Sequence, residues 1–233
     1  MGKIFNTSGD CRPTLHYMVN IENRLAEIKE MVDRGDYFTI NRARQYGKTT
    51  TLKALRYYLR EEYVVVSLDF QGLSHQDFET ENCFVKALAR EIKRKPLLQN
   101  ELPHETVDVL GRFACGMQGM GLAELFECFN GWCQESAKPI VFMIDEADSA
   151  TNNQVFLDFL AQLKRVYLER DEIPAFQSVI LAGVYDVKNL KQKLRPNDRQ
   201  RANSPWNIAA DFRVDMSFSA ADIAGMLGEY EAD

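Results

Sequence analysis

Short apolar runs that alternate with segments of helical period constrain the fold of this chain most. Three of them, at 63–70 (YVVVSLDF), 138–148 (KPIVFMIDEAD) and 178–183 (SVILAG), are apolar almost throughout, the second until it reaches its carboxylates. Such runs are typical of strands that lie in a parallel sheet and are covered on both faces. A shorter run at 37–41 is β-branched and aromatic, and a weaker one follows at 214–218. We therefore expect five strands.

The segments between these runs have the 3.6-residue period of amphipathic helices. Alternating strands and helices indicate an α/β fold, with a central, mainly parallel sheet and helices on both of its faces. A glycine-rich stretch at 111–121 is expected to interrupt the helical region, and Ser219 is a candidate N-cap for the last helix. The expected helices lie at 21–34, directly after 47–49, at 84–94, at 122–136, at 155–170 and after 219.

Length and composition favour one cytoplasmic domain. With 233 residues, 45% of them hydrophobic, the chain suits a single domain over 1–233 in which 1–36 form a lead-in and a helix. A net charge of -6 argues against a surface that binds nucleic acid over its whole extent. The five cysteines include no C-x-x-C pair, as in a reducing cytoplasm, and the three histidines are scattered. No apolar stretch is long enough for a signal peptide or a membrane span, so no membrane association is expected.

The residues after the first strand predict a phosphate-binding loop. They match the pattern G-x-x-x-x-G-K-[ST], except that Arg42 replaces the first glycine. The pattern places a lysine near phosphate oxygens, a threonine hydroxyl near Mg²⁺, and a helix N-terminus facing the anion. Taken alone, Gly-Lys-Thr could be a chance tripeptide at a surface turn, and the two loop arginines either face phosphate or are solvated. The expected nucleotide-binding residues are Arg42, Ala43, Arg44, Gln45, Tyr46, Gly47, Lys48, Thr49 and Thr50.

Two adjacent carboxylates, Asp145 and Glu146, end the run at 138–148. A buried strand does not tolerate charge in its middle, so both must emerge at the carboxyl edge of the sheet, where α/β proteins bind ligands. We expect Thr49 and Asp145 to hold Mg²⁺, and Glu146 to act with Lys48 in catalysis by polarising the attacking water. The alternative is that the two acids only cap the next helix. The letters DEAD also match a helicase signature, but the phosphate loop and the chain length do not suit that class.

Four further features remain open between function and structure. Tyr185 or Asp186, after the run at 178–183, is either a sensor of the phosphates or part of a plain strand exit. Asp69 lies near the same edge of the sheet and is more typical of a structural residue. The basic segment 190–207 either supplies an arginine finger, or contacts a DNA backbone or a protein partner, or is a solvated loop. Trp206 within it is expected to be a packing anchor.

Several of these stretches together carry a resemblance to a known family. YFTINRARQYGKTTTL, VVVSLDF, VFMIDEAD, SVILAGVYD and the ending SPWNIAADF…DMSFS resemble bacterial AAA-like or ORC-like P-loop ATPases, which are related to the STAND and archaeal ATPase groups. The resemblance implies a three-layer fold with strand order 5-1-4-3-2. It implies a Walker A pair at Lys48 and Thr49 and a Walker B pair at Asp145 and Glu146. A basic or polar residue in place of the first loop glycine is a feature of the family, which accounts for Arg42.

The resemblance also implies an activity. We expect Mg-ATP to be the ligand, bound and hydrolysed by an ATPase that acts as a switch or motor, with homo-oligomers among its candidate assemblies. The alternative is a non-catalytic module that binds DNA or a protein partner through 190–207 when ATP is present; a small-molecule kinase is a third, weaker reading. Members of the family often continue into a C-terminal lid and a restriction-endonuclease-like domain. Because the chain stops at Asp233, we expect neither here, and the sequence suits the N-terminal part of a longer protein or a short protein in its own right.

Overall fold

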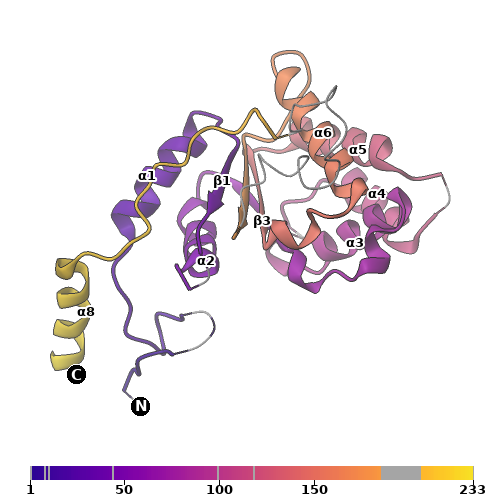
Figure 1. The fold of residues 1–233 in the computed structure, drawn as a ribbon. Helices are drawn as coiled ribbons and strands as arrows, with labels where there is room; N and C mark the ends of the chain where they lie inside the picture. The colour runs from indigo at the N-terminus through magenta and orange to yellow at the C-terminus, as the bar shows by residue number, and fades with distance from the viewer. Residues whose placement is uncertain are drawn as a thin grey trace, which may run out of the picture.

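A parallel sheet of four strands lies at the centre of the computed structural model, which describes residues 2–7, 9, 11–43, 45–98, 100–117, 119–184 and 206–232 (Figure 1). Their spatial order is β1-β4-β3-β2, as expected for the first four strands. All three pairings are parallel, so the carboxyl ends of the strands share one edge. The strands are β1 (Phe38–Asn41), β2 (Val64–Asp69), β3 (Ile140–Asp145) and β4 (Ser178–Gly183).

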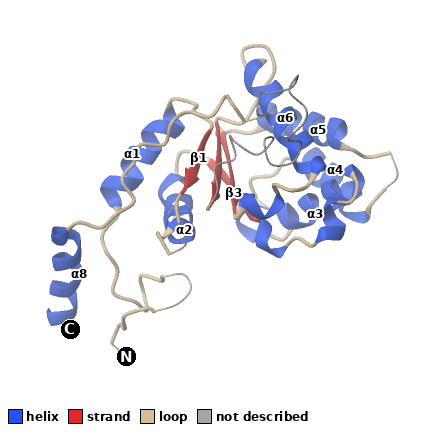
Figure 2. Ribbon diagram, in the orientation of Figure 1, coloured by secondary structure: helices blue, strands red, loops and turns tan. Residues whose placement is uncertain are grey.

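Helices cover both faces of this sheet, which makes three layers (Figure 2). α1 and α2 pack on one face, and α3, α5 and α6 pack on the other, where α4 joins them (Figure 1). Short 3-10 helices lie between these elements, at Phe70–Gly72, His75–Phe78, Pro96–Leu98 and Ala147–Ala150. The α-helices are α1 (Glu22–Asp33), α2 (Lys48–Leu59), α3 (Glu81–Lys93), α4 (His104–Cys115), α5 (Leu122–Glu135), α6 (Gln154–Leu168) and α8 (Ala220–Ala232).

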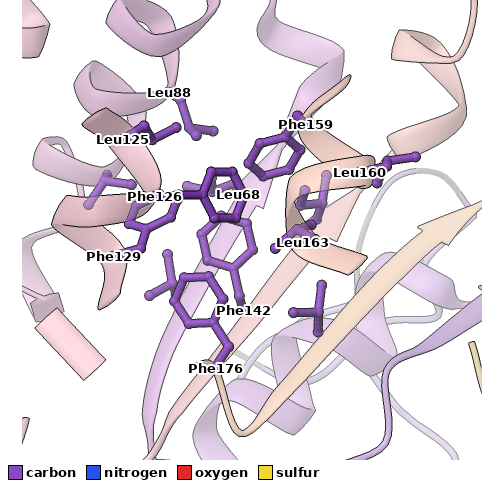
Figure 3. Close-up of a cluster of buried hydrophobic side chains, with 14 of the residues drawn as sticks. Leu68, Leu88, Leu125, Phe126, Phe129, Phe142, Phe159, Leu160, Leu163 and Phe176 are labelled. Carbon is purple, nitrogen blue, oxygen red and sulfur yellow. The ribbon is translucent and has the colours of Figure 1, made fainter. Parts of the chain in front are cut away.

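The central strands supply both cores because side chains alternate between the faces of a strand. On β3, Val141 and Met143 pack against α1 and α2, whereas Phe142 and Ile144 face α5 and α6. Figure 3 shows Phe142 within an aromatic group on this second face. Its ring lies 4.9 Å from that of Phe176, centroid to centroid. The continuous apolar run in the sequence predicts a strand that is buried on both faces, and β3 has this arrangement.

The prediction of a fifth strand at 214–218 is wrong. The described segment 210–217, which we call the strap, contacts β1 through an isolated bridge between Phe38 and Ala210. It then crosses toward α1, where the Arg24 guanidinium donates to the carbonyl oxygens of Asp215 (3.1 Å) and Ser217 (3.0 Å). These carbonyls therefore bond to a side chain instead of to a neighbouring strand.

The N-terminal segment packs beside α8, near the other end of the chain. The α8 helix begins as expected, because the Ser219 hydroxyl accepts from the Asp222 amide at 3.1 Å. No α8 side chain is buried among the described residues. The rings of Phe5 and Tyr17 contact that of Tyr230 on α8.

In the described ranges, no helix is long and apolar enough to cross a membrane.

The break expected at 111–121 is shorter than predicted. Residues 111–115 continue α4, and the helix ends at Gly116, whose φ of +73° is the left-handed conformation that glycine adopts at helix ends.

Candidate functional site

The loop between β1 and α2 presents an open helix N-terminus at the carboxyl edge of the sheet. Gly47 precedes α2 with a φ of +71°, a conformation that favours glycine. No described atom lies within 4 Å of a Cβ built there, so the backbone angle, and not lack of space, is what requires glycine. No described side chain caps the helix. The first-turn amides of such a helix can therefore serve as donors for an anion.

Lys48 occupies the interior of this loop. Its side chain is only 6% exposed, although lysine is almost never buried without a partner. The ammonium donates to the carbonyl oxygens of Arg42 (2.9 Å) and Ala43 (3.2 Å). The two carbonyls thus satisfy a charge that oxygens of a bound phosphate could also satisfy.

The two predicted motifs meet at the end of β3. Asp145 is the last residue of that strand and is nearly buried. Thr49, in the first turn of α2, lies close enough for its side chain to lower the pKa of the Asp145 carboxyl. Glu146 follows in the left-handed region, with a φ of +53°, and its amide donates to Asp145 Oδ1 at 3.0 Å. This backbone turn directs the chain away from the strand at the residue that we expect to be the catalytic base.

Negative charge exceeds positive charge among the described groups here. Burial, above all, raises the pKa of Asp145, and the neighbouring Asp69 adds to this, while the Thr49 side chain and Lys48 oppose it. Burial also raises the pKa of Glu146, with further contributions from Asp145 and Asp148. In register, Asp69 on β2 pairs with Asp145 on β3. A divalent cation would relieve this repulsion.

The chemistry of the donors suits Mg²⁺ only together with a nucleotide. In the part of the chain that the structure describes, no three His, Cys, Asp or Glu side chains are grouped as a metal site. Mg²⁺ commonly takes one or two protein oxygens and completes its octahedron with water and phosphate oxygens. Thr49 and Asp145 match that limited requirement.

The remaining loop residues are placed as follows. The Arg42 guanidinium lies 5.6 Å from the centre of the Phe212 ring and donates to the carbonyl of Val214 at 3.4 Å. Its side chain therefore faces the strap, neither the loop interior nor open solvent, while its carbonyl lines the loop. Ala43, Gln45 and Tyr46 are exposed, the Thr50 hydroxyl accepts from the Cys11 amide at 3.5 Å, and Arg44 lies outside the described residues.

The other candidates have mixed outcomes. Tyr185, Asp186 and the basic residues of 190–205 lie outside the described residues. Trp206 is a packing anchor, as expected: it is fully buried, and its indole N–H donates to the Thr39 hydroxyl at 2.9 Å. The Asp69 carboxylate caps a short helix by accepting from the Gln71 amide at 2.9 Å, the structural role that is typical at such a position.

One residue at this edge was missed. Asp148, three residues after Asp145, accepts the amide of Val184 at 3.0 Å, just beyond the end of β4. The sequence contains a third acid after Asp145 and Glu146, but nothing local relates that acid to β4.

Comparison with known proteins identifies the family. The sequence model of a family described as an AAA-like domain matches residues 14–233. The fold is similar to that of the Walker-type ATPase PaBY2304 of Pyrococcus abyssi, with a TM-score of 0.64 and 18% identity over 91% of this chain and 57% of that one. Cdc6p from Pyrobaculum aerophilum is also similar, with a TM-score of 0.50 and 14% identity over 90% of this chain and 48% of that one. No curated protein matches.

This chain thus spans about half the length of the two similar structures. At these identities the likeness concerns the fold alone. Because the family match covers nearly the whole sequence, the chain belongs to the AAA-like domain family, and its fold is that of a P-loop ATPase.

Proposed function

We propose that this domain binds Mg-ATP at the carboxyl edge of its sheet and hydrolyses it as a nucleotide-dependent switch. The observation that carries the proposal is the approach of Thr49 to Asp145, which is close enough for the Thr49 side chain to lower the pKa of the Asp145 carboxyl. It joins residues almost one hundred positions apart, from two motifs that one Mg-nucleotide site requires together. Either motif alone would be weaker evidence for a Mg-nucleotide site.

Lys48 and the α2 N-terminus would bind the phosphates. The Lys48 ammonium already lies inside the loop, where it donates to two carbonyl oxygens. Phosphate oxygens carry more negative charge than carbonyls and accept stronger hydrogen bonds from an ammonium group. Binding therefore exchanges weaker acceptors for stronger ones without moving the lysine out of the loop. Thr49 and Asp145 would hold Mg²⁺, which neutralises developing charge on the phosphates.

Glu146 is the candidate general base. It is partly exposed at the site edge, which leaves its carboxylate accessible to water. In the proposed step, the carboxylate accepts a proton from a water molecule as that water attacks the terminal phosphorus. The bond to the leaving ADP oxygen breaks, and inorganic phosphate is released. Asp145 is buried and accepts the Glu146 amide, so it is less suited to this role.

The switch part of the proposal is supported by Arg42. Its carbonyl accepts from Lys48, whereas its guanidinium bonds to the strap at Val214. A bound phosphate that draws Lys48 away from this carbonyl would alter a residue that the strap also contacts. Nucleotide occupancy can in this way bias the position of the strap and of α8 beyond it.

Glu146→Gln tests the assignment of the base. We expect the variant to keep its affinity for Mg-ATP, because glutamine preserves size and polarity, and to lose turnover by roughly 100- to 10,000-fold, the usual contribution of a general base. Calorimetry measures binding, and phosphate release measures turnover. Glu172→Gln, at an exposed position away from the site, is the matched control.

Normal turnover in Glu146→Gln would show that the base is assigned wrongly. Saturable binding with no turnover in the unaltered protein would instead favour a non-catalytic nucleotide-binding module. Absence of any binding would reject the proposed function as a whole.

Thr49→Val tests the proposed metal ligand. Valine has nearly the shape of threonine but lacks the hydroxyl, so we expect turnover to fall on the order of 100-fold, equivalent to a few kcal/mol of lost charge stabilisation. Thr49→Ser keeps the hydroxyl and should stay close to the unaltered protein. The measurement is turnover against Mg²⁺ concentration. Equal behaviour of the valine and serine variants would contradict the assignment.

A further inference from the structure

We propose that Asp148 and Gly183 form a clamp that positions the loop bearing Glu146 relative to the phosphate loop. Asp148 is then a positioning residue for hydrolysis, acting through the end of β4 and not through contact with the substrate. The inference rests on the proposed function for its effect on turnover. The contacts of the clamp do not depend on it.

The Asp148 carboxylate lies directly against the backbone of β4. Its Oδ2 accepts the Val184 amide at 3.0 Å. Its Oδ1 and Cγ lie only 2.7 Å and 2.9 Å from the position that a Cβ on Gly183 would take. Contacts this short essentially do not occur for real Cβ atoms. Gly183 is in the ordinary negative-φ range, so a side chain there would be opposed by the Asp148 carboxylate, which would have to shift, and not by the backbone angle.

The same glycine also contacts the phosphate loop. The Gly183 carbonyl accepts the Arg42 amide at 3.2 Å, and Gly183 pairs in register with Asn41, the last residue of β1. Because β4 lies between β1 and β3, its end is the point at which the two motifs share a neighbour. The backbone of Gly183 and Val184 is therefore bonded to Asp148 through an amide and to Arg42 through a carbonyl.

On the other side of the clamp, Asp148 is rigidly joined to Glu146. The Asp148 carbonyl accepts from the Thr151 hydroxyl at 2.7 Å and from the Thr151 amide at 3.3 Å. The Ser149 amide donates to the Glu146 carbonyl at 3.0 Å. The turn from 146 to 151 is thus tightly bonded within itself. A shift of Asp148 relative to β4 would carry Glu146 with it.

The clamp leaves one buried oxygen without a hydrogen-bond donor in the described part of the chain, which costs free energy of folding. Asp148 Oδ1 is buried and has no hydrogen-bond partner among the described residues. A buried acceptor without a donor is unfavourable, and more so when it is charged. An apolar residue would avoid this cost but would leave the Val184 amide without its acceptor. Asparagine would keep an acceptor for that amide, and this makes it the informative conservative substitution.

The experiment compares Asp148→Ala, Asp148→Asn and Gly183→Ala in the full chain. Asp148→Ala should bind ATP with unchanged KM while kcat falls on the order of 100-fold, as expected when a catalytic group is misplaced. Asp148→Asn should recover about tenfold of that loss, the worth of one retained hydrogen bond. Asp158→Asn is the control, because it removes a carboxylate on α6 that accepts from Gln154 in the same helix, away from the clamp.

A double-variant cycle of Asp148→Ala and Gly183→Ala shows whether the two residues act together or lower kcat independently. Gly183→Ala alone should lower kcat, because the new methyl group displaces the Asp148 carboxylate. In the double variant, alanine at position 148 removes the two nearest atoms, Oδ1 and Cγ, and leaves only its Cβ at 3.2 Å, a contact that a shift of a few tenths of an ångström relieves. The kcat of the double variant should therefore be no lower than that of Asp148→Ala alone, in contrast to the multiplied loss of two independent sites. If the fold-loss of kcat in the double variant equals the product of the two single losses, the proposal is overturned.

Amide hydrogen exchange at Val184 in the nucleotide-free protein tests the clamp without reference to hydrolysis. Exchange should be faster in Asp148→Ala and slow in Asp148→Asn. If the unaltered protein proves inactive, this pattern still establishes the clamp, and the failure belongs to the proposed function. Unchanged exchange, or unchanged kcat in Asp148→Ala beside an active unaltered protein, would overturn the inference.

Discussion

Lys48→Ala is expected to weaken Mg-ATP binding by about 3 kcal/mol, a factor on the order of 100, since it removes charged hydrogen bonds from the phosphates. The ammonium lies inside the loop between β1 and α2 and is almost fully buried. No other described lysine donates to the loop carbonyls of Arg42 and Ala43, so none can replace it. Calorimetric titration with Mg-ATP measures the effect, with circular dichroism to establish that the variant is folded.

Lys53→Ala is the matched control for this prediction. Lys53 lies on the same helix but is exposed, so its removal changes the net charge equally and keeps Lys48 as the donor to the loop carbonyls. We expect its affinity to stay near that of the unaltered protein. Equal losses in the two variants would mean that only general electrostatic attraction is involved. An unchanged affinity in Lys48→Ala would reject the phosphate site.

Phe142→Ala is expected to lower the free energy of unfolding by about 3–5 kcal/mol, the usual cost of removing a fully buried aromatic side chain. Phe142 is completely inaccessible at the middle of β3. Its ring contacts those of Phe129, Phe159 and Phe176, which come from other elements and cannot all move into the space (Figure 3). Chemical denaturation, followed by circular dichroism, measures the change.

Phe218→Ala controls for the loss of a phenyl ring as such. Phe218 is 48% exposed, and its ring is contacted by the Arg24 guanidinium at 5.2 Å. We expect a loss of about 1 kcal/mol or less, typical of an exposed cation–π contact. A similar loss in both variants would show that the aromatic group around β3 is not the main stabilising core.

The local sequence was sufficient to predict the residues that the candidate site brings together. Lys48 and Thr49 follow a β-branched strand and open a helix, and Asp145 and Glu146 end an apolar run that cannot hold charge in its middle. Each of these relations spans only a few residues. A parallel sheet then places both motifs at one edge. The clamp was beyond such reasoning, because no pattern along the chain shows that the Asp148 carboxylate lies against the backbone at the end of β4.

The strap shows the opposite case, in which a local pattern was misleading. VDMSF alternates in the manner of a strand, and Val214 and Met216 are indeed buried. They are buried against the α1 and α2 side of the core, while Arg24 on α1 binds the strap carbonyls. Alternation of apolar and polar residues predicts which side chains are buried. It does not predict which groups form hydrogen bonds with the backbone.

The sequence by itself therefore predicted the class of fold and the two halves of the candidate phosphate site. These follow from burial of apolar runs and from the short-range chemistry of charged residues at strand ends. The order of the first four strands came instead from the resemblance to a known family. Only the tertiary structure decided that Arg42 faces the strap, that the strap is not a strand, and that Asp148 contacts Gly183. Each of the latter depends on which distant group fills a particular hydrogen bond or space, and the pattern along one segment carries no information about its partner.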